Sequence, residues 1–298
     1  MLKQVTRAWG KAAYGAAAMG IALGCAGVVS ELVGNRYVPA AVCTLVAILL
    51  IRPFRRSREL GLTSPSEAGL RGSGLRVGLR GSGLGSGLRG FGFGVLVTGG
   101  CAAAVLGAGT LAGWISWGRF HPGDVLVFLI TNAVVAILLE AFPEEIALRG
   151  HTWTALRSQH RGVIAALGTT FLFLLVPGFS TVVQLTLSRI IGVDSPGLHL
   201  APPGQDPVSY FILLIVFGFT LIAARQATGS LWTSIGTHLT FLTVNRVTID
   251  GAKRNTGWSA DLVSPDVLLL IPLYLLLAAI IYRRMYAART SGASRSIA

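Results

Sequence analysis

The sequence is poor in charged residues. Only 12% of the 298 residues are Asp, Glu, Lys or Arg, whereas 52% are hydrophobic. A soluble globular domain carries roughly 25% charged residues, so this composition excludes that class. The mean hydropathy of +0.66 places the chain in a lipid bilayer.

Cysteine is also scarce. Cys25, Cys43 and Cys101 all fall in apolar segments, where they are expected to be small packing residues. Three thiols so placed support neither a disulfide framework nor a cysteine-bound metal site. The chain also lacks the HExxH motif of zinc peptidases.

Long apolar runs, by contrast, are abundant. A helix needs about 20 mostly apolar residues to cross a hydrocarbon core ~30 Å thick. Eight such runs, bounded by charge, glycine or proline, lie at residues 12–33, 37–51, 93–115, 124–143, 162–180, 208–224, 230–247 and 266–282. The predicted fold class is therefore all-α, a polytopic membrane helix bundle with about eight transmembrane helices.

The distribution of arginine and lysine predicts the orientation of this bundle. If Lys3, Arg7 and Lys11 are cytoplasmic, most of the arginines in the rest of the chain fall on the same side. Both termini are then cytoplasmic, and a bacterial inner membrane is the expected location. The net charge of +13 indicates contact with the anionic lipid of the cytoplasmic leaflet and not with nucleic acid.

The chain divides into four predicted parts. They are an N-terminal transmembrane hairpin at 1–51, a Gly/Arg-rich cytoplasmic loop at 52–92, a transmembrane bundle at 93–282 and a cytoplasmic tail at 283–298. The loop repeats GLRGSGL with a nine-residue period and cannot bury enough apolar surface to fold alone. It is predicted to be a flexible cationic tether, with binding of RNA or a partner protein as the alternative.

The fourth apolar run ends in acidic residues, in the stretch LLEAFPEEIALRGHTW. On a helical wheel at 100° per residue, Glu140, Glu144 and His151 fall within a ~40° sector. Glu145 and Arg149 share another sector at i, i+4 spacing, which predicts a structural ion pair at the cytoplasmic end of the span. The two adjacent glutamates therefore have different predicted roles.

Glu144 is the candidate catalytic carboxylate. A lipid-facing carboxylate costs at least ~2.5 kcal/mol, so Glu144 is expected to face the bundle interior. Glu140 lies one turn away, and two carboxylates so close together suit general acid–base work. Pro143 cannot donate a hydrogen bond, which predicts a loosened or kinked helix with room for water directly before Glu144. The alternative is an interfacial carboxylate that merely ends the span.

A second polar face lies in the seventh apolar run, SLWTSIGTHLTFLTVNR. Ser234, His238 and Asn245 follow one face of this helix. A lone histidine in a membrane is more often a hydrogen-bonded packing residue than a catalyst. A position opposite Glu144 in the same bundle makes His238 a catalytic candidate.

These two stretches resemble the CPBP family, the CAAX proteases and bacteriocin-processing intramembrane peptidases. EEIALRG matches the family's EExxxR motif, GSLWTSIGTH resembles its later histidine helix, and the resemblance covers about 124–247. It implies a water-filled cavity open to the cytoplasmic side, where Glu144 activates a water and His238 stabilises the developing oxyanion. The expected supporting residues are Glu145, Arg149, Glu140 and Asn245.

The sequence departs from the family pattern at two positions. In the FxxxH motif, Phe173 is followed four residues later by Pro177, and in the HxxxN motif His238 is followed by Leu242. The nearest asparagine is Asn245. Half of the expected catalytic set is thus missing, so catalysis is expected to be weakened or lost.

No cofactor or metal is expected. A zinc site needs three or four ligands, and the chain gathers only Glu144, Glu140 and His238. Whether a metal takes part in the family's reaction is disputed, so the resemblance adds no ligand set.

Three functions remain open. The favoured one is an intramembrane endopeptidase acting on a peptide or prenylated protein. The second is an inactive relative that binds peptides or membrane proteins, in immunity or as a scaffold. The third is a transporter or channel using the intramembrane carboxylates, but the two halves of the chain show no inverted repeat that would support it.

Overall fold

The computed structural model describes residues 2–54, 57–62, 83–193 and 206–295. Within these residues, seven helices are long and apolar enough to cross a membrane. Regular strand is limited to one two-stranded sheet in the described part. The prediction of an all-α polytopic membrane bundle is confirmed.

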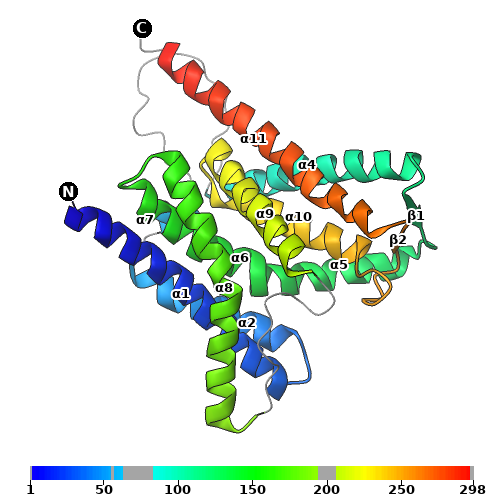
Figure 1. Cartoon of the computed structure of the whole chain (residues 1–298), viewed down its shortest axis with the longest axis horizontal. Helices are drawn as coiled ribbons and strands as arrows, with labels where there is room; N and C mark the ends of the chain where they lie inside the picture. The colour runs from blue at the N-terminus through cyan, green and yellow to red at the C-terminus, as the bar shows by residue number, and fades with distance from the viewer. Residues whose placement is uncertain (1, 55–56, 63–82, 194–205, 296–298) are drawn as a thin grey trace.

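The N-terminal part is a helical hairpin. Helix α1 (Leu2–Leu32) packs against α2 (Tyr37–Ile51), which continues into the 3₁₀ turn η1 (Arg52–Phe54), and α3 (Ser57–Leu60) follows. Helix α1 also lies along α8 (Gly162–Ile191), as Figure 1 shows.

The C-terminal part forms a second group of helices. Helix α4 (Gly83–Leu111) packs against α10 (Leu231–Thr248) and α11 (Leu270–Arg295), and α9 (Pro207–Thr228) packs against α11. Helix α4 begins inside the predicted 52–92 loop, and α11 runs into the predicted 283–298 tail. Most of the repeated GLRGSGL segment lies outside the described residues.

Close packing in this group depends on small residues. A side chain on Gly94 would meet the Thr233 carbonyl, and one on Gly236 would meet the Phe91 carbonyl, so α4 and α10 approach each other backbone to backbone. The buried Tyr282 hydroxyl of α11 lies 2.7 Å from Thr237 Oγ1, which ties α11 to the same pair. Hydrogen bonds of this kind replace the hydrophobic driving force that lipid does not supply.

A single long helix, residues 122–157, connects the two groups and is here termed the central helix (Figure 1). It comprises α5 (Pro122–Ala136), η2 (Ile137–Ala141), α6 (Phe142–Glu144), η3 (Glu145–Thr152) and α7 (Trp153–Arg157). Its η3 turn contacts α1 on one side and α10 on the other. The helix thus extends fourteen residues beyond the predicted end at 143.

The π-helical turns η2 and η3 flank Pro143 on both sides. Pro143 has no N–H to offer, and the helix accommodates this by widening its turns while α6 continues through the proline. The expected loosening before Glu144 therefore takes the form of two π-helical turns.

Helix α10 departs from the prediction in composition. It occupies the predicted 230–247 span but is too polar to count among the seven candidate spans. The reason is its position in the interior, where Thr233, Ser234, Thr237 and His238 are all buried against protein and not against lipid. A helix surrounded by other helices has no need of an apolar surface.

A tight turn sets α10 antiparallel to α9. Gly229, with φ of +73°, ends α9 in the left-handed conformation, and the Ser230 side chain caps the start of α10. At the other end of α9, Asp206 Oδ2 accepts a hydrogen bond from Ser209 N at 2.8 Å. This bond lowers the pKa of the Asp206 carboxyl below its ordinary value.

A short sheet, which the hydropathy pattern did not predict, lies at one end of the bundle. Strand β1 (Ile115–Trp117) pairs antiparallel with β2 (Ala260–Leu262), next to the 3₁₀ turn η4 (Pro265–Leu269). Trp117 stacks on Trp258 with 4.1 Å between ring centroids. The sheet joins the chain segments that follow α4 and α10.

Candidate functional site

A buried polar cluster joins the central helix to α10. Glu145 Oε1 lies 3.2 Å from Arg149 Nη1 and 3.2 Å from His238 Nδ1. The i, i+4 pair of Glu145 and Arg149 thus forms as its spacing predicts. Both side chains are fully buried, so the two charges are matched to each other inside the protein and do not extend to solvent.

Aromatic rings enclose this cluster. The Arg149 guanidinium carbon lies 4.7 Å from the centroid of the Phe173 ring, and Phe217 meets the His238 ring edge to face at 4.8 Å. Phe241 stacks on Phe217 at 4.1 Å. The rings exclude water and lower the local dielectric, which strengthens each charge–charge contact.

The cluster is incompletely hydrogen-bonded. Glu145 Oε2 and the three guanidinium nitrogens of Arg149 have no hydrogen-bond partner among the described residues. Buried ion pairs of this kind contribute little stability, because desolvation offsets the attraction between the charges. The buried Glu145 therefore serves mainly to orient another side chain, the His238 ring, which it contacts through Nδ1.

Replacing Glu145 with Ala is expected to destabilise the protein by about 3–5 kcal/mol, because Arg149 would remain as a buried charge without a counterion. Thermal unfolding of the purified variant in detergent measures this loss. The double variant Glu145→Ala/Arg149→Leu should recover much of it, since both charges are then absent. If the single variant Glu145→Ala were as stable as wild type, the ion pair would not contribute to folding stability.

Glu144 differs from its neighbour in exposure and in contacts. Its side chain is partly exposed, and it forms no hydrogen bond or ion pair with the described residues. It lies within electrostatic range of His238, Glu140 and Tyr210. Glu144 is therefore the more exposed carboxylate of the glutamate pair, within electrostatic range of the histidine that contacts Glu145.

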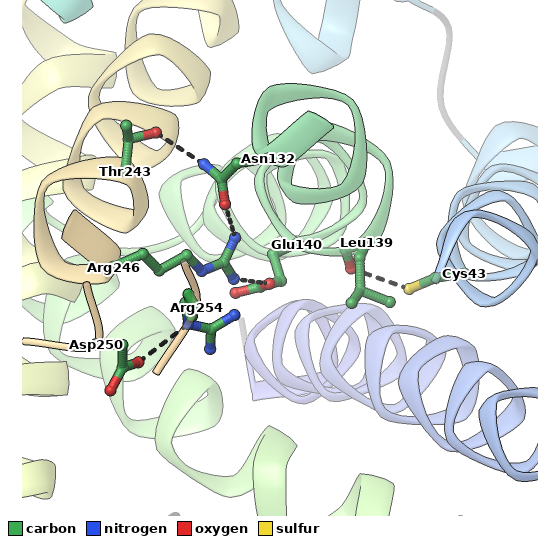
Figure 2. Close-up of polar contacts among 8 residues, drawn as sticks. All are labelled: Cys43, Asn132, Leu139, Glu140, Thr243, Arg246, Asp250 and Arg254. Carbon is green, nitrogen blue, oxygen red and sulfur yellow. Dashed lines mark hydrogen bonds and ion pairs between the residues drawn. The ribbon is translucent and has the colours of Figure 1, made fainter. Parts of the chain in front are cut away.

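Glu140 has a partner that was not predicted from the sequence. Figure 2 shows Arg246 of α10 reaching Glu140 Oε1 through Nη2, while its Nη1 donates to Asn132 Oδ1 at 2.8 Å. Asn132 Nδ2 donates in turn to Thr243 Oγ1 at 3.1 Å. The position of Arg246 within an apolar run could have indicated this ion pair, because a charged side chain inside a membrane needs a partner of opposite charge.

The remaining predicted positions do not complete the family set. Asn245 accepts a hydrogen bond from the Tyr274 hydroxyl at 3.3 Å and so faces α11. Leu242 is partly buried against the main core. Pro177 lies one turn beyond Phe173 in α8, so the family's first histidine position carries no imidazole.

Two of the other described histidines contact α1. His151 Nε2 lies 3.0 Å from the Lys11 carbonyl oxygen, which places this ring against α1. His160 meets the Trp9 ring edge to face after the end of α7. His199 lies outside the described residues.

The donor atoms near Glu144 do not fit a catalytic metal. Glu140 already forms an ion pair with Arg246, and Glu145 contacts both Arg149 and His238. Only the Glu144 carboxylate and the second nitrogen of His238 remain, fewer than the three protein ligands of a catalytic zinc. Within the described residues, no three His, Cys, Asp or Glu side chains gather into a metal site.

Together, the fold and the site define a multi-pass membrane protein with a glutamate pair opposite a histidine. Residues 125–244 match the model of the type II CAAX prenyl endopeptidase Rce1-like family, and this match supports assignment of the chain to the CPBP family. The expected core at 124–247 coincides with the match. No curated protein and no solved structure matches the chain.

Proposed function

We propose that the protein is an intramembrane endopeptidase of the CAAX type that cleaves a peptide or prenylated protein with a water activated by Glu144. The observation that carries this proposal is the partly exposed Glu144 carboxylate, which lies within electrostatic range of His238, whose Nδ1 contacts Glu145. The family match supports a protease of this class. The proposed location is a bacterial inner membrane, with both termini cytoplasmic and the basic residues on the anionic leaflet.

In this reaction Glu144 takes a proton from water as the water oxygen attacks the scissile carbonyl carbon. A protonated His238 donates from Nδ1 to Glu145 and from Nε2 to the oxyanion that forms. The tetrahedral intermediate then breaks its C–N bond, and Glu144 passes its proton to the leaving amine. Burial of the Glu145–His238 pair keeps the ring oriented without further reorganisation.

An inactive peptide-binding protein is the second candidate function. Pro177 and Leu242 favour it, because each replaces a polar group of the family's catalytic set. Such a protein would bind a peptide or membrane protein beside Glu144, in immunity or as a scaffold.

Purified wild-type protein in detergent decides between these two functions. A mixed peptide library that includes prenylated C-terminal peptides is incubated with the protein, and the products are identified by mass spectrometry with and without a chelator. Peptidase activity predicts discrete products, and loss of products with the chelator would reveal metal dependence. Peptides that co-purify uncut with folded protein would instead support the inactive binder.

A further inference from the structure

Two polar links cross between the central helix and α10 at different depths. Glu145 contacts His238, and Glu140 contacts Arg246. Because residue numbers rise along one helix and fall along the other, these segments are antiparallel. The two links therefore bracket Glu144 on one helix and position 242 on the other.

The spacing of the two links is unequal along the two helices. At 1.5 Å per residue, Glu140 and Glu145 are roughly 7.5 Å apart along the axis, whereas His238 and Arg246 are roughly 12 Å apart. Side chains in a helix lean toward its N-terminus, so the long Arg246 side chain extends back toward the level of His238. This lean and the length of the arginine make up the difference.

Arg246 is held at two points. Its Nη1 donates to Asn132 Oδ1 at 2.8 Å, two turns of the central helix away from Glu140, which receives Nη2. Asn132 is itself fixed by its donation to Thr243. In Figure 2 the arginine lies between α10 and the central helix with one amine on each acceptor. A planar guanidinium bound at both ends resists sliding of one helix past the other.

Glu140 lies within a π-helical turn. Residues 137–141 form η2, a type of turn that is rare and frequently occurs at functional sites. The Glu140 and Arg246 side chains are 23% and 15% exposed, so the pair lies largely outside water, where the attraction between charges is stronger than at a surface.

We propose that Arg246 is a positioning residue that sets the register of α10 against the central helix and so keeps His238 beside Glu144. It does not touch the reacting atoms and acts through His238. The catalytic part of this inference rests on the proposed peptidase function, whereas the register itself is a property of the fold.

Cross-linking tests the register without any need for activity. Cysteines replace Phe142 of the central helix and Trp232 of α10, whose ring centroids are 6.1 Å apart, and a short thiol-specific bifunctional reagent joins them in full-length protein in detergent. Neither residue is a partner of Arg246, so its two contacts stay intact in this background. The linked peptides are identified by mass spectrometry, which separates them from products of the native cysteines. Arg246→Leu is expected to slow this linkage several-fold.

Arg254→Leu is the matched control. Arg254 pairs with Asp250 four residues earlier in the same chain segment, and both side chains are substantially exposed (Figure 2). Its removal should leave the rate of linkage between positions 142 and 232 unchanged. Equal rates in wild type, Arg246→Leu and Arg254→Leu would overturn the proposal.

Kinetics test the consequence for catalysis. Arg246→Leu is expected to lower kcat by about 10²-fold with KM little changed, since a shift of about 1 Å in a catalytic group has an effect of this size. Arg246→Lys should retain part of kcat, and cross-linking the two cysteines in the Arg246→Leu background should restore it.

An unchanged kcat in Arg246→Leu would contradict the positioning role. If wild type cleaves nothing, the peptidase proposal fails and the linkage rates alone decide the register.

Discussion

Glu144→Gln is expected to abolish peptide cleavage and to leave the yield of folded protein unchanged. An amide cannot take a proton from water, and loss of a general base lowers turnover by roughly 10²–10⁴-fold. The fold should tolerate the change, because Glu144 is partly exposed and forms no ion pair with the described residues. Initial rates of product formation, read by mass spectrometry on one cleaved peptide, measure the effect.

Two comparisons make this result specific. Glu31→Gln, at an exposed position near the end of α1, removes a carboxylate of the same chain and should cleave at the wild-type rate. Glu145→Ala should lose stability as well as activity, which Glu144→Gln should not. If Glu144→Gln turned over at the wild-type rate, the general base would have to be another group.

The apolar runs predicted most of the helices because the bilayer fixes the length and composition of anything that crosses it. Seven predicted segments correspond to helices that are long and apolar enough to span. The contact between Glu145 and Arg149 was equally predictable, since neighbours at i, i+4 follow from the helical repeat alone.

Contacts between helices could not be derived from the same periodicity. A helical wheel places Glu140 and Glu144 on one face, but it does not say which residue of another helix lies opposite. The structure pairs Glu140 with Arg246 and His238 with Glu145. Both pairings depend on the rotation and depth of α10 relative to the central helix, which the packing of whole helices determines.

The π-helical turns explain part of the difference between the helical-wheel prediction and the observed side-chain directions. Each wide turn adds a residue to the helical repeat and so rotates the subsequent residues relative to a regular wheel. Turns η2 and η3 lie on both sides of Glu144, so an angle computed at 100° per residue accumulates error across this stretch. His151, which the wheel places in one sector with Glu140 and Glu144, packs against α1.

Leu242→Asn is expected to raise kcat by about 10²-fold, the effect usually associated with one oxyanion-hole donor. Position 242 lies one turn after His238 on the same face of α10. An amide there would donate a second hydrogen bond to the oxyanion, beside the one from His238. Because Leu242 is only partly buried, the polar group can be accommodated at modest cost. Rates for wild type and variant on the same peptide measure the gain.

Leu239→Asn is the matched control for this gain. Leu239 is also partly buried against the main core, but it directly follows His238 and so lies on another face of α10. The same amide there carries the cost of a buried polar group without reaching the oxyanion. A gain confined to Leu242→Asn would mean that the wild-type site is a peptidase limited by one missing donor. Equal rates in both variants would mean that position 242 does not face the reacting carbonyl and that the absent amide does not limit the rate.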